Sequence, residues 1–159
     1  MGVKIATTRF GDLDLPDEKV ITFPKGLIGF AQVRRFVVLD HPGGGPFQWL
    51  QAVDVPELAF VVTDPTLFFR DYQVPVKSEE LRSIGIESMD EGVVVVILVV
   101  PKDPKGITAN LQGPIVINVA RRLARQFVLD MPQYTTKHPI FPEKGVPQAL
   151  APAGKGASC

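Results

Sequence analysis

Few side chains in this sequence have the chemistry of a catalytic or metal-binding site. The two histidines, His41 and His138, lie about a hundred positions apart in predicted loops, and the one cysteine, Cys159, is the last residue. Catalysis needs a base or nucleophile held by partner groups, and a metal site needs several ligands at suitable spacing. Neither pattern is present, so we expect no catalytic residue, no metal site and no cofactor.

The charged residues do not indicate a nucleic-acid partner. Lys plus Arg and Asp plus Glu number 17 each, so the chain has no overall basic charge to attract phosphate backbones. The densest basic cluster, residues 121–125, has three arginines and no interleaved aromatic residue. We interpret it as a solvent-exposed turn between two strands. Gly43–Gly45 is followed by no Lys-Ser or Lys-Thr pair, so we expect a loop there and no phosphate site.

The elements that must position any site are predicted to be short strands. At 159 residues the chain fits one domain, which we place at residues 1–140, and residues 141–159 read as a flexible tail rich in Pro, Gly and Ala. Runs of Val, Ile, Phe and Thr between Pro, Gly and Asp are typical of strands. The predicted strands are 3–8, 10–15, 19–23, 36–40, 47–53, 59–63, 72–76, 93–100, 115–119 and 126–129.

So many strands in one small domain favour a closed sheet, because closure removes exposed strand edges. We therefore predict a mainly β fold, a small antiparallel barrel-like domain. One short helix is expected from Ser78, as a cap, to Gly85, as a stop signal, and a helical turn is expected around 29–34.

The sequence also indicates where the protein resides. Its N-terminus lacks a basic start followed by an apolar stretch, so we expect no secretory signal. The longest apolar run, Val93–Val100, has eight residues, whereas a membrane-spanning helix needs roughly twenty. We expect a cytoplasmic protein with no membrane partner.

The first candidate contact surface is the segment 63–72, which follows a predicted strand and carries three aromatic residues. Neighbouring side chains of an extended chain point to opposite faces, so Phe68 and Phe69 are not both expected to point inward. Aromatic anchors flanked by charges, here Asp64 and Asp71, are typical of protein-binding hot spots. The partner-binding hypothesis thus includes Asp64, Phe68, Phe69, Asp71 and Tyr72, and burial under the helix remains the alternative.

Two further segments complete the candidate surfaces. In 23–30 the glycines interrupt regular structure while apolar side chains still need to be covered, so Phe23, Ile28 and Phe30 are candidate contacts, with core packing as the alternative. In 107–118 a polar turn leads into an apolar strand that Pro114 can open. This arrangement predicts that Asn110 lies on an exposed rim.

Six motifs in this order together resemble the FliW family of flagellar assembly factors, over residues 3 to about 140. They are Ile21-Thr22-Phe23-Pro24 with Gly26, Gly29 and Phe30; Phe47-Gln48-Trp49-Leu50-Gln51; Leu58-Ala59-Phe60 with Asp64-Pro65; Gly85-Ile86; Thr108-Ala109-Asn110-Leu111 with Pro114-Ile115-Val116-Ile117-Asn118; and Tyr134 with His138-Pro139-Ile140.

That resemblance implies a small β-barrel-like fold and a cytoplasmic regulator without enzymatic activity. It implies two protein partners, flagellin and the RNA-binding translational regulator CsrA, and no direct contact with RNA. In the implied switch, flagellin occupies the protein until export lowers its concentration, and the freed protein then captures CsrA and relieves repression of flagellin synthesis. Such a switch requires that binding of one partner disfavours the other.

Two other functions remain open from the sequence. A small β-barrel can house a ligand or act as an enzyme, which would require an apolar pocket with converging polar groups. A direct RNA-binding module would lose affinity steeply with salt, and the balanced charge of the chain disfavours it.

Overall fold

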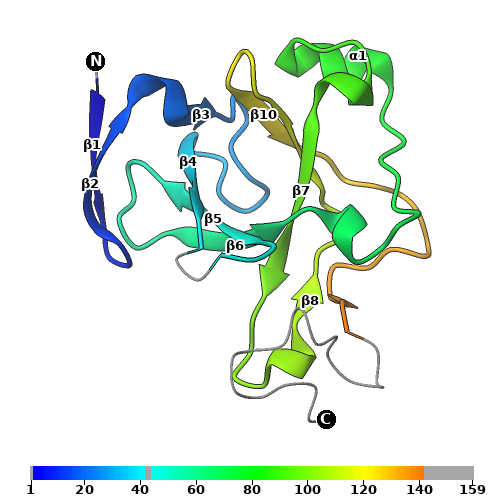
Figure 1. Cartoon of the computed structure of the whole chain (residues 1–159). Coiled ribbons are helices and arrows are strands. Elements are labelled where there is room, and N and C mark those ends of the chain that lie inside the picture. Colours follow the sequence, from blue (N-terminus) through cyan, green and yellow to red (C-terminus); the bar gives the residue numbers. More distant parts are fainter. Residues whose placement is uncertain (1, 42–43, 142–159) are drawn as a thin grey trace.

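The fold is a closed β-barrel with a hairpin and a helical segment outside it (Figure 1). A computed structural model of the chain describes residues 2–41 and 44–141. The strands are β1 (Gly2–Thr7), β2 (Gly11–Pro16), β3 (Val20–Thr22), β4 (Arg35–Asp40), β5 (Phe47–Ala52), β6 (Ala59–Thr63), β7 (Val93–Val99), β8 (Thr108–Ala109), β9 (Ile115–Asn118), β10 (Leu123–Gln126) and β11 (His138–Pro139).

The helices are short. They are the α-helix α1 (Ser78–Leu81) and the 3-10 turns η1 (Asp17–Lys19), η2 (Pro65–Leu67), η3 (Arg82–Ile84), η4 (Met89–Glu91) and η5 (Pro104–Gly106).

Seven of the described strands close the barrel. Strands β3 to β7 pair in sequence as antiparallel neighbours, β7 also pairs with β9, and β9 pairs with β10. The ring closes where β10 runs parallel to β3, through the register pair Leu123 and Thr22. The predicted mainly β, barrel-like fold is confirmed. Closure hides strand edges that would otherwise offer unpaired main-chain groups.

The barrel interior is filled by large apolar side chains from every wall. Phe23 and Phe36 are fully buried and meet edge to face, with ring centroids 5.1 Å apart. The same cluster also includes Leu27, Leu50, Ala52, Val62, Val95, Ile115, Ile117 and Ala124. The alternation of the strands sends these residues inward, and burial of each large side chain contributes roughly 1.5–3 kcal/mol.

The β1–β2 hairpin lies against the outside of the barrel, at the left of Figure 1. Ile5 packs with Val37 and Val53 of the barrel wall. The hairpin turn is held by Trp49 of β5, because the Arg9 guanidinium lies 4.5 Å from the Trp49 ring centroid and Phe10 meets the same ring edge-on. The strands predicted at 3–8 and 10–15 are confirmed as β1 and β2.

One predicted strand is absent and another is shifted. Segment 72–76 forms no strand, although the alternating burial of Val74 and Val76 mimics one, and Pro75 has no N–H for a ladder. The strand predicted at 126–129 begins earlier, as β10 at Leu123, so part of the arginine cluster lies in a strand and only residues 119–122 form the turn. The two-residue strands β8 and β11 were not predicted.

The predicted helix is confirmed as α1 followed by η3. It ends at Gly85, which has the left-handed φ of 83°. Ser78 is the first helical residue, with Lys77 at the cap position and no side-chain cap hydrogen bond. The expected helical turn at 29–34 is wrong. The chain here forms separate hydrogen-bonded turns, and Leu27 and Phe30 pair in an isolated antiparallel bridge.

Most of the expected tail, residues 142–159, lies outside the described residues. Phe141, its first residue, is buried and meets Phe68 edge to face, at 6.0 Å between ring centroids.

The loop after β3 depends on two left-handed glycines that differ in their surroundings. A Cβ on Gly26 would lie 2.6 Å from the main-chain oxygens of Phe30 and Ala31, whereas a Cβ on Gly29 would meet nothing within 4 Å. We expect Gly29→Ala to lower the free energy of unfolding by about 1–2 kcal/mol, from backbone strain alone. Gly26→Ala adds a main-chain clash and should lower it by clearly more. Urea unfolding of both variants checks this, and equal losses would contradict the packing of the loop.

Candidate functional site

A groove on the barrel wall brings together three of the residues that the sequence singled out. It has a volume of about 320 Å³ and lies between the loop after β3 and the chain that follows β10. We call it the amide groove. Its lining residues are Leu27, Ile28, Phe30, Phe60, Ile97, Asn110, Gln112, Gly113, Gln126, Val128 and Thr136. Ile28, Phe30 and Asn110, which come from two distant sequence motifs, therefore share one surface.

The rim of the amide groove is apolar and exposed. Ile28, Phe30 and Val128 expose 58%, 40% and 72% of their surface to solvent. Phe30 is held by an edge-to-face contact with Phe60, at 5.5 Å between centroids. Three exposed apolar side chains around one hollow are typical of a surface that a partner covers.

The groove also contains carboxamides. Gln126 joins its walls, since Oε1 accepts a hydrogen bond from the Ile28 N–H at 2.9 Å and Nε2 donates to the Gly113 carbonyl at 2.9 Å. Gln112 Nε2 donates to the Tyr134 carbonyl. Asn110 Oδ1 is buried and has no hydrogen-bond partner among residues 2–41 and 44–141. A buried acceptor without a hydrogen bond is unfavourable in free energy.

Asn110 is half-buried, at the base of the groove rather than on the exposed rim that the sequence predicted. Sequence reasoning missed Gln112, Gln126 and Val128. Gln112 and Gly113 stand inside the motif around Asn110, which was a usable signal. Nothing local in the sequence marks Gln126 or Val128, because their position depends on the pairing of β10.

The aromatic segment 63–72 mainly stabilises the fold. Phe68 stacks on Phe47, with ring centroids 6.1 Å apart, and Phe69 meets the His138 imidazole edge-on at 5.1 Å. Tyr72 is buried and its hydroxyl donates to the Leu111 carbonyl at 2.7 Å. The expectation that one of the two phenylalanines is exposed is wrong, since both are half-buried against the second core cluster.

The carboxylates of that segment remain on the surface. Asp64 is exposed and accepts hydrogen bonds from the Thr66 N–H and hydroxyl, so it caps η2. Asp71 is exposed.

Two motif residues proved to be structural. Phe23 is fully buried in the barrel, so it presents no contact surface and the core-packing alternative applies to it. Asn118, at the end of β9, donates to the Ile84 carbonyl at 2.7 Å and accepts from the Arg121 N–H. It ties η3 and the β9–β10 turn to the barrel.

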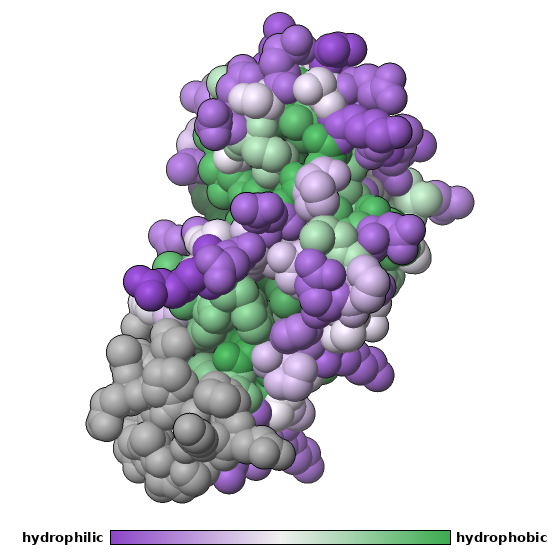
Figure 2. Space-filling view, turned by 90° about the vertical axis from the view of Figure 1, so that its right-hand side faces the viewer, coloured by the Kyte–Doolittle hydropathy of each residue, from purple (hydrophilic) through white to green (hydrophobic). Residues whose placement is uncertain are grey.

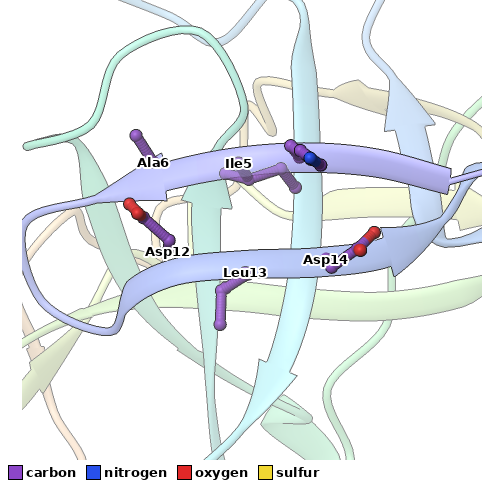
Figure 3. Close-up of a pocket in the computed structure, with 6 residues that line it drawn as sticks. Ile5, Ala6, Asp12, Leu13 and Asp14 are labelled. Atoms are coloured by element: carbon purple, nitrogen blue, oxygen red, sulfur yellow. The ribbon is translucent and has the colours of Figure 1, made fainter.

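Two other hollows contain none of the predicted contact residues. One, of about 440 Å³, is an open face of the β1–β2 hairpin, where Figure 3 shows Asp12 beside Ala6 and Leu13 pointing to the opposite side. The other, of about 370 Å³, is the mouth of the barrel, where apolar residues such as Ile21, Val38 and Ile117 lie below charged rim residues.

Within the described residues, no group of three or more His, Cys, Asp or Glu side chains is arranged to hold a metal ion. In the same residues, no helix has the length and apolarity needed to cross a membrane.

Comparison with known proteins gives a consistent result. A family model described as FliW protein matches residues 4–140. A flagellar assembly factor FliW from Natranaerobius thermophilus is 43% identical over 144 residues, covering 90% of this chain and 95% of the relative. One from Geobacter sulfurreducens is 42% identical, covering 98% and 96%. A crystal structure of a flagellar assembly factor FliW superposes with a TM-score of 0.82 at 38% identity, covering 89% of this chain and 99% of that one.

Tyr72 gives a test of the packing beside the site. Burial raises the pKa of its hydroxyl above the usual 10.0, and nearby Tyr134 contributes in the same direction. The unfolded chain loses this proton first, so the free energy of unfolding should fall as the pH rises above about 10. Tyr72→Phe should cost about 1 kcal/mol at neutral pH and weaken the alkaline fall. Urea unfolding at pH 7 to 11 measures both, and unchanged stability at every pH would contradict the buried hydrogen bond.

Proposed function

Because this chain belongs to the FliW family, we propose that it is a non-enzymatic cytoplasmic flagellar assembly factor that binds flagellin and antagonises CsrA. The observation that carries the flagellin part is the amide groove, an uncharged hollow with an exposed apolar rim. A subunit destined for a filament has interfaces that are uncovered before assembly. An apolar groove on a cytoplasmic protein can cover such a surface.

The proposal for CsrA is supported by a different face of the molecule. Residues 79–91, from α1 to η4, contain five carboxylates, Glu79, Glu80, Glu87, Asp90 and Glu91, and one arginine, Arg82. Figure 2 shows hydrophilic residues along the upper rim of the face that carries α1, around a hydrophobic patch. A basic RNA-binding protein would be attracted to this acidic segment even though the chain as a whole is neutral, because complementarity acts locally.

The two surfaces are linked through β10. Arg125 Nη1 donates to the Ser83 hydroxyl beside α1, and the next residue, Gln126, holds the wall of the amide groove. A shift of β10 caused by one partner would therefore change the surface for the other. This connection supports the proposed negative coupling, in which flagellin and CsrA each lower the affinity for the other.

The groove is tested with Ile28→Asp and a matched control. Ile28 contributes its main-chain N–H to the fold while its side chain is 58% exposed, so the variant should fold normally. A buried charge at the rim should weaken flagellin binding by at least about tenfold. Leu67→Asp places the same charge at a residue that is 57% exposed outside the groove and should bind normally. Calorimetric titration with monomeric flagellin measures this, and equal affinities would remove the groove from the account.

The acidic segment is tested by charge reversal. Glu79→Lys with Asp90→Lys should weaken CsrA binding at low salt by about tenfold and leave direct flagellin binding unchanged. Glu57→Lys, at another exposed carboxylate, is the control. Light scattering with size-exclusion chromatography on mixtures with each partner reports the complexes. If the wild-type protein forms a complex with neither flagellin nor CsrA, the proposed function as a whole is contradicted.

The barrel mouth supports a second candidate function, ligand binding. Its hollow of about 370 Å³ combines apolar walls with Lys19, Asp40 and Arg122 at the rim, the combination that a small amphiphilic ligand requires. A metabolite that raises the melting temperature of the wild type, but not of a variant with Val93→Arg, would favour this function, because Val93 lines the hollow and is 48% exposed.

A further inference from the structure

One wall of the amide groove is an unpaired stretch of main chain. Beyond β10 the N–H groups of Phe127 and Leu129 donate to the carbonyls of Pro114 and Gln112, at 2.9 and 2.7 Å. Alternate residues of an extended chain direct their main-chain groups to opposite sides, so those of Val128 face away from residues 112–114. Within residues 2–41 and 44–141 the N–H and C=O of Val128 make no hydrogen bond, and the residue is 72% exposed.

The edge is open because β3 ends early. Its parallel pairing with β10 consists of the one register pair, Leu123 with Thr22, and the chain then turns into the loop 23–30. That loop contacts the end of β10 through a side chain, since the Ile28 N–H donates to Gln126 Oε1. The amide groove therefore lies where a strand paired with the chain after β10 would otherwise lie.

The carboxamides that line the groove leave little room beside the wall. A Cβ on Gly113 would approach Asn110 Nδ2 and Gln126 Nε2 to 2.8 Å, and Asn110 Oδ1 is buried beyond the reach of a partner atom. The unpaired polar groups that a partner can reach on this wall are therefore the main-chain N–H and C=O of Val128.

We propose that the amide groove binds an extended, uncharged segment of its partner as an added strand along Val128, an inference that rests on flagellin being that partner. The segment pairs with the main chain of Val128 and inserts an apolar side chain between Ile28 and Phe30. The lining contains no charged residue, which excludes a charged side chain from the hollow.

A helix is a poorer occupant of this groove. Its main-chain groups are already paired within the helix, so it would cover Val128 without satisfying the N–H and C=O of that residue. Strand addition satisfies these main-chain groups and gains affinity from main-chain hydrogen bonds.

Val128→Pro and Val128→Thr separate main-chain pairing from side-chain contact. Proline removes the unpaired N–H, which the free protein does not use, whereas threonine keeps the N–H and the side-chain shape. In calorimetric titrations with monomeric flagellin we expect about a tenfold or greater loss for the proline variant and less than about a threefold loss for the threonine variant. The melting temperature of each variant checks its fold.

Hydrogen exchange on the wild-type protein provides a readout that needs no variant. The Val128 amide should exchange rapidly in the free protein and much more slowly in the complex. Strand addition alone would be overturned if the wild type binds flagellin, the proline and threonine variants bind it equally well, and exchange of the Val128 amide is the same in the complex as in the free protein. Failure of the wild type to bind flagellin would overturn the proposed function and this occupant together.

Discussion

The structure depends on the pairing that closes the barrel, between β10 and β3. The Thr22 N–H donates to the Arg122 carbonyl at 2.9 Å, directly before Leu123 enters β10. To reach this position the chain turns through Arg122 with a left-handed φ of 57°, the only such value at a non-glycine residue of the described part. A conformation that costs of order 1–3 kcal/mol persists only where its surroundings enforce it. Here the Arg122 guanidinium also bonds to the Asp17 carbonyl.

That closure creates the candidate site. Because β3 pairs with β10 over so short a length, the chain after Gln126 and the loop 23–30 diverge, and the amide groove lies between them. The same strand carries Arg125 to the helical segment, so one element connects the groove with the acidic surface. Closure of the fold and coupling of the proposed sites therefore depend on the same few residues of β10.

The fold class could be predicted because strand alternation and turn residues are local signals, as in the β1–β2 hairpin. The position of β10 could not, since Arg121 and Arg122 resemble a fully exposed turn and only the pairing with β9 and β3 makes Leu123 a strand residue. Segment 72–76 shows the reverse error, because its alternation arises from side-chain packing against β7, β9 and the segment from α1 to η3, and involves no ladder.

The candidate site was predictable only where its residues lie in local motifs. Ile28, Phe30 and Asn110 could be selected from motifs that carry glycine and exposed apolar residues, but Val128 acquires its role only from the unpaired edge beyond β10. The aromatic residues Phe68 and Phe69 were candidates by composition. The stacking of Phe68 on Phe47 and the edge-on contact of Phe69 with His138 are tertiary effects that no spacing in the sequence reveals.

Site-specific photocrosslinking tests most directly whether flagellin occupies the amide groove. A photoreactive amino acid would be placed at position 28, in the groove, and in a second protein at position 67, which is equally exposed outside the groove. Each protein would be irradiated in the presence of monomeric flagellin. We expect a covalent adduct with flagellin from position 28 and little or none from position 67. An adduct from position 67 alone would contradict occupation of the groove.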